Sequence, residues 1–199
     1  MEQIPFPNKK YQIIYVDPPW SFKTYSKKGK EKKSAECHYD CMTINDIYDL
    51  PVNTIAHDDC VLFLWVTFPL LQEGLETIKR WGFTYKTCGF NWVKKNKNVD
   101  SWFWGLGYWT RSNSELCLLA TKGKPKRISK SVHQVCDAKT LKHSEKPREI
   151  RNKIVELVGD LPRIELFARQ KTEGWDVWGN EVEEGGRESK ESMEVEDDW

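Results

Sequence analysis

A carboxylate, two prolines and a tryptophan follow one another at residues 17–20, directly after the first apolar run of the chain. Proline has no N–H group and holds the residue before it in an extended conformation. The stretch Asp17-Pro18-Pro19 is therefore expected to form a stiff turn that is rich in hydrogen-bond acceptors and poor in donors. Such a turn suits a ligand group with N–H donors, and Trp20 offers an aromatic face on which the ring of that ligand could stack.

The amino group of a nucleic-acid base fits this description, because it carries two N–H donors on a flat ring. Its nitrogen is a poor nucleophile, since its lone pair is delocalised into the ring. Acceptance of both hydrogens, at the carboxylate of Asp17 and the carbonyl of Pro18, would draw the nitrogen toward tetrahedral geometry and free that lone pair. A methyl group held in line could then be transferred directly, with neither a covalent cysteine intermediate nor a metal.

The elements that must hold this turn alternate between short apolar runs and amphipathic segments. The expected strands are 11–16, 61–66, 84–93, 116–121 and 163–168. A short helix is expected to begin at Thr43, and two longer helices are expected over 69–81 and 147–158. Residues 125–142 are expected to add a hairpin. This alternation indicates an α/β fold with a largely parallel sheet. Ligands bind at the carboxyl ends of the strands in such sheets, which is where Asp17 falls.

Two long stretches lack any regular period. Residues 23–36 are polar and rich in lysine, and residues 94–115 contain several tryptophans, so both are expected to be loops, the second a functional one. The two glycines of 104–109 follow a polar loop rather than a strand. We therefore interpret them as a source of loop flexibility and not as a phosphate-binding turn.

The charge of the chain is unevenly distributed. Of its 31 basic and 30 acidic residues, two and nine lie in residues 181–199, which gives that segment a charge of −7 and leaves residues 1–180 with +8. We expect one domain over 1–180 and an acidic, disordered tail over 181–199. A basic body favours a polyanionic partner.

Other classes of protein are disfavoured by the sequence. The six cysteines include only one close pair, Cys37 and Cys41, and no second pair that would complete a structural zinc site, so no metal is expected. No signal peptide opens the chain, and no apolar run reaches the ~20 residues of a membrane span. The expectation is a cytoplasmic protein with reduced thiols and no membrane association.

Six motifs occur here in an order that resembles the MT-A70-like adenine methyltransferases. They are DPPW (17–20), LFLWVT (62–67), GYWTRSNSELCLLATKG (107–123), HSEKP (143–147), RIELFAR (163–169) and WGNE (178–181). The resemblance covers 11–181 and is closest in form to the compact phage and bacterial members. It implies a single-domain, Rossmann-like methyltransferase fold in permuted order, with the amine-binding motif before the cofactor-binding strand.

The resemblance implies S-adenosylmethionine as the cofactor. The positions that match the family's cofactor-binding residues are Asp17, Lys146, Phe167, Arg169, Asn180 and Glu181. Phe167 and Arg169 would border the ribose, and Asn180 and Glu181 would bind its hydroxyls. Glu181 replaces the glutamine of the eukaryotic catalytic subunit, and Lys171 replaces a histidine there, which leaves the role of Lys171 open. The cofactor's adenine would meet backbone near 3–6.

The resemblance also implies which residues meet the substrate. Besides Asp17, Pro18, Pro19 and Trp20 as the catalytic turn, these are Tyr25, Trp104, Trp109, Arg111, Glu115, Ser144 and Lys146. Loops 22–40 and 96–112 match the two gate loops of the family and combine lysines with stacking aromatics. The target adenine must leave its stack to reach the turn, so a flipped base or a single strand is expected.

Several alternatives remain beside methylation of DNA adenine, which the compact architecture favours. The same reaction could act on RNA adenine, or the chain could be a nucleic-acid-binding partner subunit, although such subunits lose the DPPW residues. A cytosine amino methyltransferase usually carries serine in place of Asp17. A module that only binds nucleic acid would not need Asp17 or the cofactor-binding cluster. A homodimer or a second subunit is expected, because no target-recognition domain is visible.

Overall fold

The computed structural model describes residues 5–21, 42–107, 109–140 and 145–179. Its strands are β1 (Tyr11–Val16), β2 (Ala56–Val66), β3 (Thr84–Val93), β4 (Ser114–Lys122), β5 (Val135–Cys136), β6 (Arg163–Leu166) and β7 (Asp176–Trp178). Its helices are α1 (Ile44–Tyr48), α2 (Leu71–Arg80) and α3 (Glu149–Val158), with short 3₁₀ turns η3 (Val52–Thr54) and η4 (Phe68–Leu70). The five predicted strands and three predicted helices are all present.

The described strands form one sheet in the order β5-β3-β4-β2-β1-β6-β7. Strand β1 pairs in parallel with β2 and β6, β6 with β7, and β3 with β5, whereas β4 runs antiparallel to its neighbours β2 and β3. The predicted, largely parallel α/β sheet is therefore confirmed. As a consequence β1, β2, β3 and β6 all end at one edge of the sheet, and β4 begins there.

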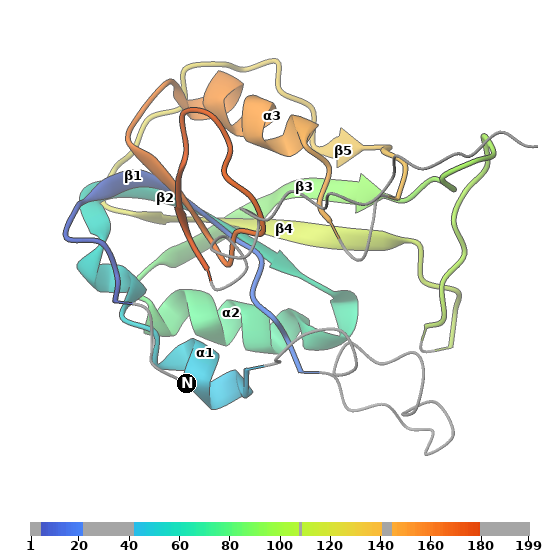
Figure 1. Ribbon diagram of the computed structural model, residues 1–199, viewed down its shortest axis with the longest axis horizontal. Coiled ribbons are helices and arrows are strands. Elements are labelled where there is room, and N and C mark those ends of the chain that lie inside the picture. The colour runs from blue at the N-terminus through green and yellow to red at the C-terminus, as the bar shows by residue number, and fades with distance from the viewer. Residues whose placement is uncertain (1–4, 22–41, 108, 141–144, 180–199) are drawn as a thin grey trace, which may run out of the picture.

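Helices cover both faces of this sheet, with α1 and α2 on one side and α3 on the other (Figure 1). The first face packs a core that includes Ile14, Leu62 and Ile78, and the second packs one that includes Tyr15, Phe63 and Ile154. Alternate residues of the same strand thus enter different cores, as the period of two in a strand requires. The three layers are consistent with a Rossmann-like methyltransferase fold.

Local sequence explains where the helices start and stop. Thr43 and Asp46 form a capping box at the predicted helix start, in which each side chain accepts a hydrogen bond from the backbone N–H of the other. The predicted helix at Pro69 opens with the η4 turn and becomes α-helical at Leu71. Gly82, with φ of +81°, follows the end of α2, where only glycine adopts this conformation at little cost.

The predicted hairpin at 125–142 is wrong. Among the described residues of this segment, 125–140, the only regular element is β5, which pairs in parallel with β3 at the far edge of the sheet. The chain before β5 instead crosses the α3 layer, where the N–H groups of Ile128 and Ser129 donate to the carbonyl of Leu157. Strand β7 was not predicted, because three residues are too few to show a period. Within the described residues, no helix is long and apolar enough to cross a membrane.

Candidate active site

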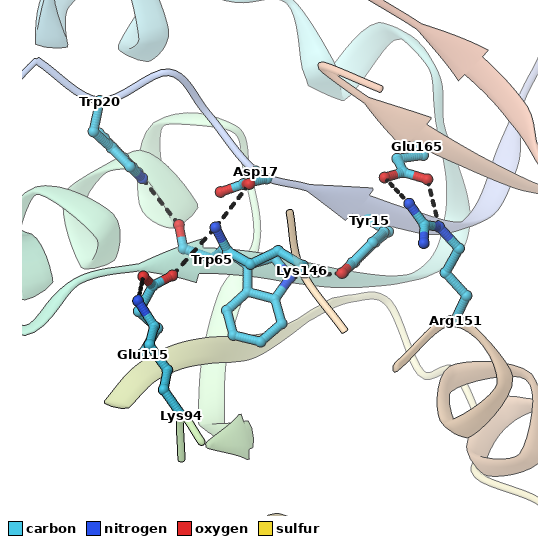
Figure 2. Close-up of polar contacts among 9 residues, drawn as sticks. All are labelled: Tyr15, Asp17, Trp20, Trp65, Lys94, Glu115, Lys146, Arg151 and Glu165. Carbon is cyan, nitrogen blue, oxygen red and sulfur yellow. Dashed lines mark hydrogen bonds and ion pairs between the residues drawn. The ribbon is translucent and has the colours of Figure 1, made fainter. Parts of the chain in front are cut away.

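Four ionised side chains meet at the edge where the parallel strands end (Figure 2). Asp17 directly follows β1, Lys94 directly follows β3, Glu115 is the second residue of β4, and Lys146 lies three residues before α3. The sheet order brings them together, since β4 and β2 lie between β3 and β1. Residues separated by up to 129 positions in the sequence thus form one site.

These side chains alternate in sign along a continuous chain of contacts. The Lys94 ammonium pairs with Oε1 of Glu115, and Oε2 of Glu115 lies 3.2 Å from Nζ of Lys146. The same Nζ donates to Oδ2 of Asp17 at 2.8 Å. The Lys146 and Glu115 side chains are 9% and 12% exposed, whereas Asp17 is 25% exposed. The other end of this series of contacts, Lys94, is 19% exposed, so Asp17 is the most exposed of the four side chains.

The pKa values of the buried members follow from these contacts. Burial alone would raise the pKa of Glu115, but the charges of Lys146 and Lys94 outweigh it and lower that pKa to about 2. Burial alone would lower the pKa of Lys146, and the carboxylates of Asp17 and Glu115 outweigh it and raise that pKa above its ordinary value. Both groups are therefore charged throughout the physiological pH range.

The backbone of the proline turn is fixed by two hydrogen bonds. The N–H of Trp20 donates to the carbonyl of Pro18 at 2.8 Å, and the N–H of Met42 donates to the carbonyl of Pro19 at 3.2 Å. A carbonyl oxygen has two lone pairs, so that of Pro18 retains one for a further donor. The prediction of a turn that presents acceptors at the end of β1 agrees with this geometry.

The predicted stacking face of Trp20 is wrong. Its side chain is 5% exposed and belongs to the core on the α1 and α2 face. Its indole N–H donates to the carbonyl of Trp65 at 3.0 Å, and the indole N–H of Trp65 donates to the hydroxyl of Tyr15 at 2.7 Å. Burial of an aromatic ring with its N–H satisfied anchors the turn to β2 rather than leaving a surface for a ligand.

A second group of residues lies where β6 and β7 end. Phe167, directly after β6, has φ of +59°, a strained conformation for a non-glycine residue that is concentrated at functional sites. Its ring contacts Trp178 edge-on, and Trp178 stacks on Phe6 with ring centroids 4.6 Å apart. This cluster draws the N-terminal segment to the same edge of the sheet as Asp17.

Close packing holds the two strand ends together at this cluster. A Cβ atom at Gly179 would lie 2.7 Å from the carbonyl oxygen of Ala168, so only glycine fits there. The half-buried Arg169 follows Ala168 directly in the sequence. Aromatic rings, a guanidinium group and the buried ammonium of Lys146 suit a cofactor that has an adenine, a ribose and a carboxylate. The residues present therefore fit S-adenosylmethionine.

The tryptophans expected to meet the substrate lie in the loop between β3 and β4, at the same edge. Trp104 is 63% exposed and Trp109 is fully exposed. The glycines of this loop allow close approach rather than flexibility, which corrects our expectation. The N–H of Gly105 donates to the carbonyl of Ser112 at 2.7 Å, and a Cβ atom at Gly107 would lie 2.5 Å from the carbonyl oxygen of Thr110. The neighbouring Arg111 is exposed.

The ion pair that links α3 to β6 near the site was not predicted from the sequence. Arg151 on α3 and Glu165 on β6 form a buried bidentate pair, with N–O distances of 2.7 and 2.6 Å (Figure 2). The Arg151 guanidinium also lies over the ring of Tyr15. Lys94 was missed as well, although its place directly after a strand that ends at the catalytic edge was a usable signal.

Some predicted residues lie outside the described part of the chain. These are Tyr25, Ser144, Asn180 and Glu181, together with Cys37, Cys41, the whole of loop 22–40 and the acidic tail. Asn180 and Glu181 follow Gly179 directly in the sequence. Within the described residues, no group of three histidine, cysteine or acidic side chains is arranged to hold a metal ion.

Comparison with known proteins agrees with this arrangement. The sequence model of the MT-A70 family matches residues 11–181. The chain is 35% identical over 192 residues to the type II methyltransferase M.MunI of Mycoplasma sp, a match that covers 88% of this chain and 79% of that protein. It is 29% identical over 180 residues to the N(6)-adenosine-methyltransferase subunits METTL3 of Homo sapiens and Danio rerio. Those matches cover 87% of this chain but 28% of each METTL3 protein.

Proposed function

We propose, from the premise that this chain belongs to the MT-A70 family of methyltransferases, that it methylates the exocyclic amino group of adenine in DNA. The methyl donor of the family is S-adenosylmethionine, which supplies an electrophilic methyl group when it is bound. The proposal rests above all on one observation. Asp17 extends from the end of β1 on a rigid turn and presents a partly exposed carboxylate.

The acceptors of this turn are arranged for an amino group. Lys146 occupies Oδ2 of Asp17, and within the described residues Oδ1 accepts no hydrogen bond. Oδ1 and the second lone pair of the Pro18 carbonyl are therefore available for the two N–H groups of the amine. Acceptance of these two hydrogens localises the nitrogen lone pair for attack on the methyl group. The carboxylate is also placed to receive the proton that the methylated nitrogen must lose.

The charges behind Asp17 hold it in place. Lys146 fixes the orientation of the carboxylate, and Glu115 and Lys94 fix Lys146 in turn. Such preorganised groups lower the barrier because they need not reorganise during the reaction. Phe167, Arg169 and Lys146, with Asn180 and Glu181, would hold the cofactor beside this carboxylate. Trp104, Trp109 and Arg111, with Tyr25 and Ser144, would hold the unstacked nucleotide.

The relatives favour adenine, and they bear on the choice between DNA and RNA. Type II methyltransferases such as M.MunI act on DNA. M.MunI is more similar to this chain than the METTL3 proteins are, and the match covers most of the length of M.MunI. The METTL3 relatives carry N(6)-adenosine in their names and share a smaller part of their length, which keeps RNA adenine as the second candidate. A cytoplasmic location and assembly with a second subunit, as a homodimer or otherwise, belong to the same proposal.

The test is methyl transfer from tritiated S-adenosylmethionine to single-stranded DNA, duplex DNA and RNA, followed by mass spectrometry of the released nucleosides. We expect the label on N6-methyldeoxyadenosine. Label on N6-methyladenosine from RNA would move the substrate to the second candidate. Label on cytosine, or cofactor binding without transfer to any polymer in the presence of candidate partner subunits, would contradict the proposal.

A further inference from the structure

The connection from β4 to β5 carries a cluster of positive charge that the catalytic site does not use. Residues 122–130 contain five basic residues and no acidic one: Lys122, Lys124, Lys126, Arg127 and Lys130. We call residues 122–130 the basic segment. Short segments that are rich in lysine and arginine are typical of surfaces that bind polyanions.

Most of these charges are exposed and unpaired. Lys124, Lys126, Arg127 and Lys130 are exposed, and in the described part of the chain none of them forms an ion pair. Lys122 differs, because its ammonium donates to the side chain of Asn53 at 2.9 Å. The lysines of the catalytic edge are instead neutralised by carboxylates. Four cations of the basic segment thus have no ion-pair partner among the described residues.

The backbone of the basic segment is fixed to its surroundings. The N–H of Lys124 donates to the carboxylate of Asp59 at 2.6 Å, and the N–H of Ile128 donates to the carbonyl of Leu157 at 2.8 Å. Gly123 has φ of +66° and packs so close that an added Cβ atom would lie 2.2 Å from the carbonyl oxygen of Asp58. The backbone that carries these charged side chains is therefore already ordered, so binding of a ligand to them costs little backbone entropy.

The basic segment lies away from the catalytic edge. Lys122 is paired with Cys60, near the start of β2, whereas Val66 at the other end of β2 is paired with Leu116, next to Glu115. From Lys122, at the end of β4, the chain passes over the α3 layer toward β5 (Figure 1). A base held at Asp17 cannot contact these side chains, so any ligand here is bound by a separate surface.

From this placement we infer that the basic segment binds the phosphate backbone of nucleic acid at a distance from the target base. Four exposed point charges with no exposed aromatic among them suit phosphates, which need no base recognition. The inference rests on the proposed function, because the ligand is taken to be a remote stretch of the substrate polymer. A long substrate would then touch the protein at two edges, which would prolong each encounter.

The test compares two variants of the full chain that lose the same charge. Lys126→Gln/Arg127→Gln removes two cations of the basic segment, and Lys79→Gln/Arg80→Gln removes an adjacent lysine and arginine from α2, on the opposite face. Binding is measured by fluorescence anisotropy with a labelled 25-base-pair duplex of random sequence, without cofactor, over a series of salt concentrations. A single-stranded RNA of the same length serves as a second probe.

We expect the basic-segment variant to bind duplex DNA about tenfold more weakly at moderate salt, with a slope of log K against log salt that is shallower by about one to two units. The α2 variant should match the parent. With genomic DNA as the methyl acceptor, the basic-segment variant should show a raised KM and an unchanged kcat, because no residue of the catalytic edge is altered. Equal weakening on the RNA probe supports recognition of phosphate.

Unchanged affinity and slope in the basic-segment variant, or an equal change in the α2 variant, would overturn the inference. The binding arm needs no methyl transfer. A parent protein that binds DNA through the basic segment but transfers no methyl group would therefore refute the proposed function and leave this inference standing.

Discussion

At the scale of single residues, the central feature is an ammonium group shared by two carboxylates. Lys146 contacts Asp17 and Glu115 in a region where both lysine and glutamate are almost fully enclosed. A buried charge of this kind is tolerated only when it is paired on all sides. Lys146 therefore holds the carboxylate of Asp17 and is itself held by Glu115. These contacts fix the carboxylate of Asp17 and leave its Oδ1 uncovered.

Removal of Glu115 should be costly for this reason. Glu115→Gln leaves Lys94 and Lys146 with one carboxylate between them, and we expect a loss of about 3–5 kcal/mol in the free energy of unfolding. Glu76→Gln, which breaks the exposed pair with Arg80, should cost less than about 1 kcal/mol. Urea denaturation of both variants measures the difference. Equal stability of the two variants would contradict the account of the charge chain.

The same carboxylate should make the stability of the protein depend on acid. The pKa of Glu115 is about 2 in the folded protein against an ordinary value of 4.5, so its contribution is complete above about pH 4.5 and is lost as the pH falls toward 2. The shift corresponds to about 3 kcal/mol. Urea titrations between pH 5.5 and 3 should show the parent losing its advantage over Glu115→Gln. An advantage that stays constant over this range would refute the lowered pKa.

At the scale of the elements, α3 and β6 are tied by one buried ion pair. Arg151 donates two hydrogen bonds to the carboxylate of Glu165, and α3 begins three residues after Lys146. The pair therefore sets the position of the helix that carries the segment with the shared ammonium. Its members lie 14 residues apart on two different elements, so a sequence pattern alone predicts neither the pair nor its role.

We expect Arg151→Met to destabilise the protein by about 3–5 kcal/mol, because it leaves the Glu165 carboxylate buried and unpaired. The double variant Arg151→Met/Glu165→Leu should recover most of that loss, since well-packed apolar residues often replace a buried ion pair at no cost. Thermal and urea denaturation of the two variants provide the measurement. A double variant as unstable as the single one would show that the pair is not the cause.

The loop between β3 and β4 is the element that should bind the nucleotide. Trp109→Ala should weaken binding of single-stranded DNA by about 1–3 kcal/mol, the usual value of one base stacked on an aromatic ring. Affinity for S-adenosylmethionine should not change. Val99→Ala, at another exposed apolar residue of the same loop, is the control and should leave both affinities as in the parent. Loss of cofactor binding in Trp109→Ala would place this residue elsewhere in the mechanism.

At the scale of the whole molecule, most strands and helices were predictable because their apolar periods are long and their caps are clear. The strand over 84–93 and the helix beginning at Thr43 match the sequence pattern. The errors came where tertiary contacts decide the outcome. Backbone hydrogen bonds from Ile128 and Ser129 to Leu157 hold the chain before β5 against α3. Trp20 is buried against β2, which no local pattern near residue 20 reveals.

The site was predictable where a residue directly follows a strand and unpredictable where it depends on the sheet order. Asp17 belongs to the first kind, since it follows an apolar strand that the sequence predicts, and Lys94 follows another such strand although it was not singled out. Phe167 was expected inside the strand 163–168 and instead lies directly after β6. Glu165 belongs to the second kind, because its partner Arg151 comes from α3. The resemblance to the family supplied Lys146 and Glu115, whereas their pairing with each other is visible only in the structure.

The dependence of the activity on the carboxylate of Asp17 tests the account most directly. The measurement is the single-turnover rate of methyl transfer to adenine in Asp17→Ala and in the parent, together with the affinity of each for S-adenosylmethionine. Loss of the amine acceptor should slow transfer by about 10² or more, while cofactor binding is partly retained. A variant that transfers methyl within about tenfold of the parent rate would show that Asp17 does not hold the amine.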